Sequence, residues 1–150
     1  MKKPSIKFSF TVEFQLEILR YIIRDKDGGL LLKRVKPSYL VLIEHSLIAE
    51  ALSKYFKKRG RIPSENILKE EIKDLLGGRD YVNLVTQDDI PNIFKVVHNL
   101  YTEPLKDSDY IEEKILQFCT FIEMKNLNDS FDLENFEQYE EYSKKVDKIL

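Results

Sequence analysis

The segment from Ser38 to Arg59 carries the feature that most constrains the fold, because apolar side chains recur in it every three or four residues. The side chains that form this stripe are Val41, His45, Ile48, Leu52, Tyr55 and Phe56. Such spacing is typical of an amphipathic helix with one buried face. Gly60 follows the stripe, and glycine readily adopts the left-handed conformation that ends helices. The pattern therefore predicts a helix over Ser38 to Arg59 that buries this stripe.

The same periodicity runs through the rest of the chain, interrupted only by sparse glycines and prolines. It predicts further helical segments over residues 11–24, 30–35, 64–76, 88–101, 108–127 and 131–150. Residues 81–85 resemble a short strand, but no other segment offers a partner strand, so we expect a helical turn or ordered loop there. The expected fold class is all-α, with a helical globular head of about five helices followed by a helical hairpin. Residues 1–104 form the head and 105–150 the hairpin or linker region, all within one domain.

Composition is consistent with a folded domain that needs no covalent crosslinks. The chain has 150 residues, of which 43% are hydrophobic and 33% charged, enough for a core and a hydrated surface. Cys119 is the single cysteine, so no intrachain disulfide can form. The apolar stretches after the basic N-terminus are broken by charges such as Glu13 and Arg20, which fits neither a signal peptide nor a membrane span. We therefore expect a cytoplasmic location and no membrane partner.

Charge is distributed unevenly between the two halves of the chain. Residues 1–75 hold 16 Lys and Arg against 10 Asp and Glu, whereas residues 76–150 hold 8 against 16. Such polarity is compatible with head-to-tail contacts between copies, or with a basic face near nucleic acid. Solvated helix faces that happen to differ in sign would produce the same pattern. Charge alone does not choose between these interpretations.

Signatures of nucleotide chemistry are absent from the sequence. A phosphate-binding loop needs glycines followed by Lys and Ser or Thr, so that backbone N–H groups and the Lys ammonium can hold the phosphates. None of the five glycines is followed by Lys-Ser or Lys-Thr, and no Gly-x-Gly-x-x-Gly is present. We expect that the chain is not an enzyme, has no catalytic residues and binds no cofactor.

Metal and nucleophile chemistry have equally little support. The soft ligands are His45, His98 and Cys119, which lie far apart in the sequence, so no metal site is expected. Both histidines are expected at core or boundary positions. Cys119 lies in an apolar helical stretch and is expected to be a buried structural thiol. The acids of Asp107-x-Asp109 and Glu112-Glu113 are explained by the preference of helix N-termini for negative charge.

One basic cluster stands out at the end of the segment Ser38 to Arg59. Its members are Lys54, Lys57, Lys58, Arg59 and Arg61. Cations at a helix C-terminus stabilise the helix by about 0.3–1 kcal/mol each, which needs no partner. The alternative is contact with nucleic-acid phosphates or a partner, although no recognised nucleic-acid motif surrounds the cluster. We expect at most weak, non-specific DNA binding.

The helix expected over residues 108–127 has apolar residues spread unusually widely around its axis. At 100° per residue, one compact stripe contains Ile111, Ile115, Phe118, Cys119 and Ile122. Leu116 lies to one side of this stripe, and Tyr110 and Phe121 lie to the other. We expect the domain to self-associate, or to dock on a partner, through Tyr110, Leu116 and Phe121 rather than through the basic cluster. Alternatively, the last helix, with Phe136 and Tyr139, or the head covers them within one chain.

Four segments share a combination of apolar spacing and turn residues: Phe14-x-Leu16-Glu17-x-Leu19, Pro37-Ser38-Tyr39-Leu40, His45-x-x-Ile48-Ala49-x-Ala51-Leu52, and Tyr55-Phe56-x-x-x-Gly60-x-Ile62-Pro63-Ser64 leading to Ile67-Leu68. Together they resemble the N-terminal domain of DnaB-type replicative DNA helicases, in the version found in T-even-like phages. Asp107-Ser108-Asp109-Tyr110-Ile111-x-Glu113 resembles the opening of the helical hairpin in that family. The segment after Tyr101 and the acidic last helix depart from the family pattern. The resemblance covers most of the chain.

This resemblance implies an all-α oligomerisation and partner-docking domain of a replication helicase. In that family, such domains assemble into a collar through their hairpins and receive a primase or a helicase loader, while ATP hydrolysis belongs to a following RecA-like motor. Leu150 ends the sequence without a helix-terminating signal, so we expect a fragment of a longer chain that continues into such a motor. The alternative is a free-standing helical adaptor or loader-like protein with weak nucleic-acid contact. The sequence does not specify the oligomer size, the partner or the source.

Overall fold

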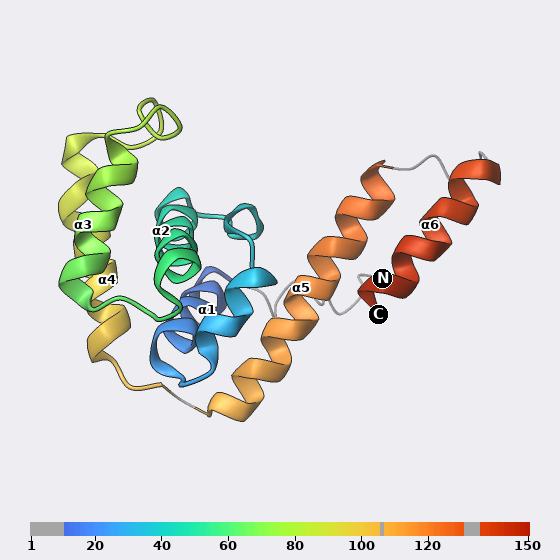
Figure 1. Ribbon diagram of the computed structural model, residues 1–150, viewed down its shortest axis with the longest axis horizontal. Coiled ribbons are helices and arrows are strands. Elements are labelled where there is room, and N and C mark those ends of the chain that lie inside the picture. Colours follow the sequence, from blue (N-terminus) through green and yellow to red (C-terminus); the bar gives the residue numbers. More distant parts are fainter. Residues whose placement is uncertain (1–10, 106, 131–135) are drawn as a thin grey trace, which may run out of the picture. The chain divides into compact units, whose positions relative to one another are not determined.

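The computed structural model describes residues 11–105, 107–130 and 136–150. These residues form helices, turns and loops, and no strand occurs among them, so the expected all-α fold class is confirmed. They belong to two compact units, residues 1–111 and residues 112–150. The sequence had placed the corresponding boundary between residues 104 and 105. Figure 1 shows the order of the helices along the chain.

The first unit is built from four α-helices and three short 3₁₀ helices among its described residues. The α-helices are α1 (Val12–Arg24), α2 (Ile43–Arg59), α3 (Glu65–Leu76) and α4 (Ile90–Thr102), and the 3₁₀ helices are η2 (Gly28–Lys33), η3 (Pro37–Tyr39) and η4 (Gln87–Asp89). Helix α2 packs against α1 and α3, and α4 packs against α1 and α3. Helix α5 (Ser108–Ser130) begins at the end of this unit.

Local capping chemistry explains where most of these helices begin and end. The Thr11 hydroxyl accepts a hydrogen bond from the Phe14 amide at 3.2 Å, and the Ser64 hydroxyl accepts one from Ile67 at 3.4 Å. Both residues act as N-caps, which satisfy amides that have no partner inside the helix. Gly60 ends α2 in the left-handed conformation with φ of 69°. These three boundaries agree with the sequence-based expectation.

The core of the first unit contains much of the apolar stripes that the sequence indicated, together with Leu19 and Leu47, which lie outside those stripes. Its larger fully buried aliphatic side chains include Ile18, Leu19, Ile22, Leu47, Ile48, Leu52, Leu68, Ile72, Ile93, Val97 and Leu100. Arg20 of α1 is also buried, where it pairs with Glu17 and donates a hydrogen bond to Oδ1 of Asn99 on α4. A buried cation is tolerated when it is paired and hydrogen-bonded, so this contact joins α1 to α4.

The prediction of where α2 begins was wrong by five residues. Residues 40 and 42 have extended backbone conformations, and the helix starts at Ile43. The Val41 amide donates to Oε1 of buried Gln15 at 2.8 Å, and the Ser46 hydroxyl donates to the carbonyl of Pro37 at 2.8 Å. These hydrogen bonds satisfy the backbone of the extended segment. Val41, expected inside, is consequently 73% exposed.

Two other positions differ from the expected orientations. Ile67, expected to face the core, is 42% exposed in the first turn of α3, whereas Leu68 and Ile72 are fully buried. His98, expected on or near the packed side of α4, has a largely exposed side chain whose Nδ1 lies 3.0 Å from Oε2 of Glu65. The loop between α3 and α4 contains turns over residues 81–85, as expected, with Val85 N donating to Tyr81 O.

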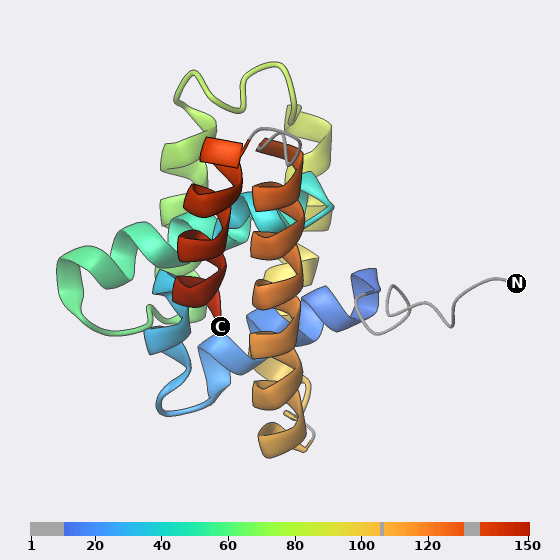
Figure 2. The same cartoon turned by 90° about the vertical axis from the view of Figure 1, so that its right-hand side faces the viewer.

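The second unit contains a helical hairpin made of α5, from Glu112 onward, and α6 (Phe136–Ile149). The two helices lie side by side and antiparallel in both ribbon views (Figures 1 and 2). The Tyr142 hydroxyl of α6 donates a hydrogen bond to Oδ1 of Asn128 on α5. The predicted start of the last helix at Phe131 lies outside the described residues. Helix α5 continues to Ser130, three residues beyond the expected end.

Candidate functional site

Helix α5 separates its apolar residues into a buried stripe and exposed flanks. Ile115, Phe118 and Cys119 are buried, and Ile122 is partly buried. Three large side chains remain at the surface: Tyr110 is 52% exposed, Leu116 42% and Phe121 37%. The stripe and the outward residues inferred from helical spacing are therefore found where they were expected. Their use as an interface stays a prediction.

Helical geometry places the three exposed residues on two different flanks of α5. Tyr110 and Phe121 are eleven residues apart, which puts them within about 20° of each other around the axis and about 16 Å apart along it. Leu116 lies about 140° from Phe121. Tyr110 and Phe121 also take part in interactions within the chain. A single flat surface would therefore contact the Tyr110–Phe121 flank or the Leu116 flank, but not both.

The last helix was the alternative cover expected for Tyr110, Leu116 and Phe121. Tyr139 of α6, one of the two aromatics expected to cover them, is itself 51% exposed. The side chain of Phe136, the other, lies outside the described residues. Val146 and Ile149 of α6 are partly buried, and Leu127 of α5 is buried. The hairpin thus buries some of its own apolar residues and still leaves Leu116 and Phe121 accessible.

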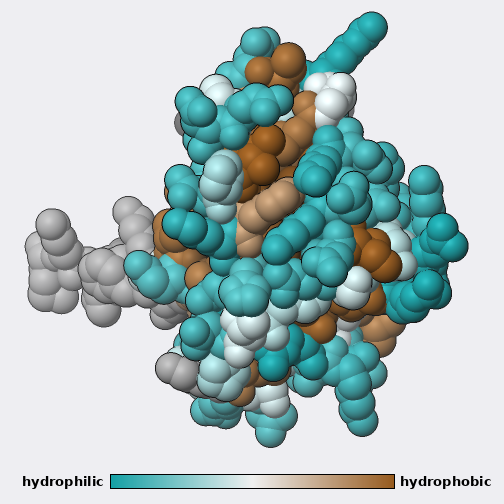
Figure 3. Space-filling view, turned by 90° about the vertical axis from the view of Figure 1, so that its left-hand side faces the viewer, coloured by the Kyte–Doolittle hydropathy of each residue, from teal (hydrophilic) through white to brown (hydrophobic). Residues whose placement is uncertain are grey.

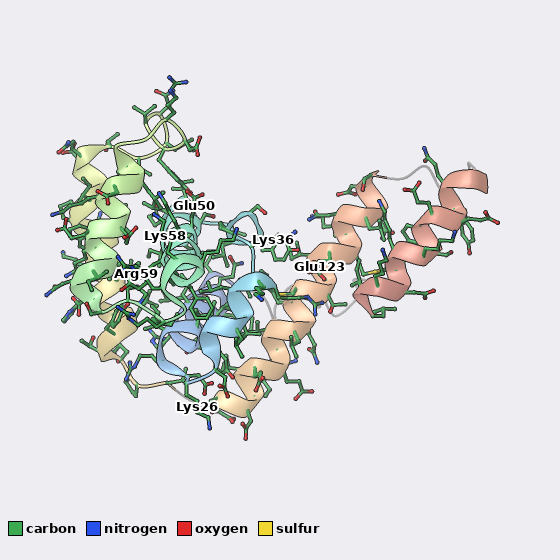
Figure 4. The ribbon with its side chains drawn as sticks, in the orientation of Figure 1. Lys26, Lys36, Glu50, Lys58, Arg59 and Glu123 are labelled. Carbon is green, nitrogen blue, oxygen red and sulfur yellow. The ribbon has the colours of Figure 1, made fainter. Side chains whose placement is uncertain are left out.

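The basic cluster lies at the C-terminal end of α2, where all five of its side chains are exposed. Lys54, Lys57 and Lys58 share one face because they are three and four residues apart. Arg59 points about 140° away from Lys54, so the cluster surrounds the helix end. None of the five forms an ion pair within the described part of the chain. Figure 4 labels Lys58 and Arg59 on this helix.

A cavity of about 440 Å³ lies beside this helix end. It is formed by the turn between α1 and η2 together with Phe56, Gly60, Arg61 and Ile62. Arg61 is the one member of the basic cluster in its lining. The sequence did not indicate this cavity, because it joins segments that are some thirty residues apart in the chain. The adjacent glycines Gly28 and Gly29 indicate a turn at this point of the chain, but they do not indicate which segment packs against it.

A second, more open groove of about 600 Å³ runs along α3 and α4. Its wall includes the Phe94 ring, over which the ammonium groups of Lys69 and Lys73 lie 5.5 and 5.8 Å from the ring centre. A cation over an aromatic face is attracted by the ring quadrupole. Figure 3 shows hydrophobic side chains on this face bordered by hydrophilic ones. The sequence analysis did not single out this groove.

Glu65 contacts Lys69 and His98 beside the groove. Its Oε2 lies 2.9 Å from Lys69 Nζ and 3.0 Å from His98 Nδ1. The hydrogen bond from Lys69, followed by that from His98, lowers the pKa of Glu65 below its ordinary value. A carboxylate held in its ionised form by two partners is poorly suited to act as a general acid at neutral pH. The arrangement is consistent with a structural link between α3 and α4.

The residues weighed for chemistry lie in separate places. His45 is buried in α2, where loss of solvation lowers its pKa below the ordinary value. Cys119 is buried in α5, as expected for a structural thiol. Within residues 11–105, 107–130 and 136–150, no group of three or more His, Cys, Asp or Glu side chains is arranged to hold a metal ion. The acids Asp107, Asp109, Glu112 and Glu113 are exposed around the start of α5.

Comparisons with protein-family models, with curated proteins and with solved structures found no match for this chain. None of the described helices has the length and apolar character required to cross a membrane. The helices and the two compact units define the chain as all-α, with a helical head and a helical hairpin.

Proposed function

We propose that this chain is a non-catalytic oligomerisation and partner-docking domain of a DnaB-type replicative helicase, acting in DNA replication of a phage. It associates with copies of itself through the outward flanks of α5, and the assembly receives a primase or a helicase loader. ATP hydrolysis belongs to a RecA-like motor in the longer protein. The observation that carries the proposal is the exposure of Tyr110, Leu116 and Phe121 beside the buried stripe of α5.

The physical argument concerns what exposed aromatic side chains contribute. Aromatic residues are enriched in interface cores, because they bury a large area at a small cost in side-chain entropy. Tyr110 and Phe121 lie on one flank of the longest helix, so a second helix laid along that flank would cover both. Leu116 would contact another chain on the opposite flank. Two flanks on one helix suit an assembly in which each copy touches two neighbours.

The second candidate is a free-standing helical adaptor or loader-like protein that touches nucleic acid. It is favoured by the five exposed cations at the end of α2, which form no ion pairs within the described residues. Unpaired cations attract phosphates, although the binding weakens steeply with salt. The two functions differ in what they require of α5, because the adaptor needs no self-association.

Light scattering on the purified chain tests the proposal. The wild type should form oligomers whose population rises with protein concentration. Phe121→Ala removes an interface aromatic and should weaken assembly by about 2 kcal/mol, roughly thirtyfold. Leu116→Asp should act in the same direction. Leu84→Asp is the matched control, because Leu84 is also exposed but lies in the loop between α3 and α4.

Circular dichroism must show that each variant is folded before its assembly is compared. A wild-type chain that stays monomeric at high concentration would contradict the proposal. Folded Phe121→Ala and Leu116→Asp variants that assemble as well as the wild type would do the same. In either case the adaptor would become the better description.

A further inference from the structure

The cavity beside the end of α2 owes its shape to a tight turn after α1. Helix α1 ends at Arg24, and η2 begins at Gly28. A side chain at Gly28 would overlap the backbone of Tyr21 and Ile22, and a Cβ atom at Gly29 would lie 2.5 Å from the Phe56 ring. Only glycines allow such close approach. The turn therefore packs directly on α1 and against the Phe56 ring.

The floor of the cavity is apolar. Ile23, Phe56 and Ile62 line it and are partly buried, whereas Leu30 at its edge is 64% exposed. A volume of about 440 Å³ falls near the lower end of ligand-pocket sizes, which run from about 300 to 1,000 Å³. The cavity is large enough for one or two apolar side chains of a partner.

The rim of the same cavity is cationic. Lys26 and Arg61 belong to the lining, and Arg59 lies three residues after Phe56 on the adjoining helical surface. Figure 4 labels Lys26 beyond α1 and Arg59 on α2. The acids in the cavity lining are Asp25 and Asp27. The Asp25 carboxylate accepts a hydrogen bond from the Asp27 amide at 3.1 Å, so it is already engaged within the turn.

Arg24 also lines the cavity, but its guanidinium contacts backbone carbonyls at the end of α4. Its Nη1 donates to the carbonyl of Glu103 at 2.5 Å and lies 3.5 Å from that of Leu100. Arg24 therefore stabilises the C-terminal end of α4. The cations left for a partner around the cavity are Lys26, Arg59 and Arg61, against the two aspartates. Lys57 and Lys58 point away from Phe56 around α2 and are not part of this set.

We propose that this cavity docks an acidic peptide segment of a partner protein, with one apolar side chain in the cavity and flanking carboxylates on the cationic rim. Arginine favours carboxylates because its planar donors can bind both oxygens. Single-stranded nucleic acid fits less well, because it needs exposed aromatic faces for stacking and Phe56 is only partly exposed. This inference goes beyond the association through α5 and does not depend on it.

Titration of the full chain with a synthetic peptide tests the proposal. The probe is a short peptide with one Phe flanked on both sides by Asp and Glu. Two matched peptides replace the Phe with Ala, or replace the acids with Asn and Gln. Binding is followed by nuclear magnetic resonance on the isotopically labelled chain. The amides of Leu30, Gly60 and Ile62 should shift with the first peptide, and both matched peptides should bind at least about tenfold more weakly.

Variants of the chain make the assignment specific. Arg61→Glu reverses a rim charge and Leu30→Asp places a charge at the apolar edge, so each should weaken peptide binding about tenfold or more. Arg79→Glu is the matched control, because Arg79 is an exposed arginine in the loop after α3. It should bind the peptide like the wild type. Since all three sites are exposed, the variants should fold, which circular dichroism verifies.

Three results would overturn the proposal. The first is equal binding of the amide peptide or of the Ala peptide, since the charge or the anchor would then be irrelevant. The second is peptide-induced shifts that avoid the cavity, or an unchanged affinity in both Arg61→Glu and Leu30→Asp. The third is tighter binding of oligothymidylate to the same residues, which would assign this surface to nucleic acid. Each of these outcomes leaves the light-scattering test of α5 unaffected.

Discussion

The hydroxyl of Tyr81 donates a hydrogen bond to Oε1 of Glu50 at 3.0 Å, which fastens the loop between α3 and α4 to α2. Burial of the ring, followed by the hydrogen bond to Glu50, raises the pKa of Tyr81 well above its ordinary value. Its ring is 6% exposed. The loop is thus held by one aromatic anchor, although Val82 and Leu84 beside it are exposed.

Loss of this hydrogen bond should destabilise the first unit measurably. Tyr81→Phe keeps the ring and removes the donor, so the free energy of unfolding should fall by about 1 kcal/mol. Tyr81→Ala also removes the buried ring and should cost about 3–5 kcal/mol. Urea denaturation measures both values. Asn83→Ala, in the same loop and exposed, should change stability by less than about 0.5 kcal/mol. Equal effects of Tyr81→Phe and Asn83→Ala would mean that the hydrogen bond does not hold the loop.

Buried His45 should make stability depend on pH. Desolvation lowers its pKa in the folded chain below 6.5, whereas Glu44 nearby opposes this shift less strongly. Between the folded pKa and the unfolded value of about 6.5, the unfolded chain binds more protons than the folded chain, so stability must fall as pH falls. The loss begins as the pH drops through about 6.5 and levels off below the folded pKa.

Thermal unfolding across that range, with a variant that cannot titrate, tests the assignment. His45→Gln should show a flatter dependence of Tm on pH below about 6.5 than the wild type. If His45→Gln leaves the pH profile unchanged while remaining folded, another group is responsible.

Helix boundaries were predictable from the sequence where the signal was local. Thr11, Ser64 and Gly60 cap their helices through their own side chains or backbone conformation, and such preferences are visible in a single sequence. The start of α2 was not predictable in this way. It depends on Gln15, whose buried amide oxygen accepts a hydrogen bond from Val41, twenty-six residues later. A tertiary contact of this kind overrides the helical spacing.

The candidate surfaces also differ in whether the sequence alone could indicate them. The exposure of Leu116 and Phe121 follows from angles around one helix, so the sequence alone indicated it. The cavity beside α2 requires Ile23, Leu30, Phe56 and Ile62 to meet, and no local pattern states which segments will adjoin. The position of the Lys69 and Lys73 ammonium groups over the Phe94 ring similarly depends on the packing of α3 against α4. Surfaces on one element are predictable from spacing, whereas concave sites between elements require the fold.

The isolated chain should not hydrolyse nucleoside triphosphates. No glycine is followed by Lys-Ser or Lys-Thr, so nothing in the sequence provides the loop that holds nucleotide phosphates. Incubation with ATP and magnesium, followed by phosphate release, should give no turnover above a no-protein control. Sustained turnover that copurifies with the chain through two columns would overturn the non-catalytic assignment.

DNA binding by the isolated chain should be weak, non-specific and sensitive to salt. The cluster around Lys58 is small, and the chain as a whole carries a net charge of −2, so phosphate contacts can be only a few. Fluorescence anisotropy with labelled duplexes of unrelated sequence should give similar affinities that fall steeply with added salt. Lys58→Gln should reduce the salt slope by about one if Lys58 contacts a phosphate. Tight, sequence-selective and salt-resistant binding would favour the adaptor instead.

The final prediction concerns how the two flanks of α5 contribute to assembly. Phe121 and Leu116 point about 140° apart, so they should contact different neighbours if both flanks are interfaces. Effects of mutations at sites without shared partners add within about 0.5 kcal/mol. Light scattering on Phe121→Ala, Leu116→Asp and the double variant should therefore give free-energy changes of association that sum. Tyr110→Ala should resemble Phe121→Ala, because the two residues lie on the same flank.

Unequal results would identify the flank that is used. If Leu116→Asp leaves assembly unchanged while Phe121→Ala disrupts it, only the Tyr110–Phe121 flank binds another copy, and the assembly should stop at dimers. If the double variant is no worse than either single variant, the two side chains act within one interface, which requires a partner that wraps around α5. An assembly weakened by Leu116→Asp alone would place the interface between copies on the Leu116 flank of α5, and not on the Tyr110–Phe121 flank.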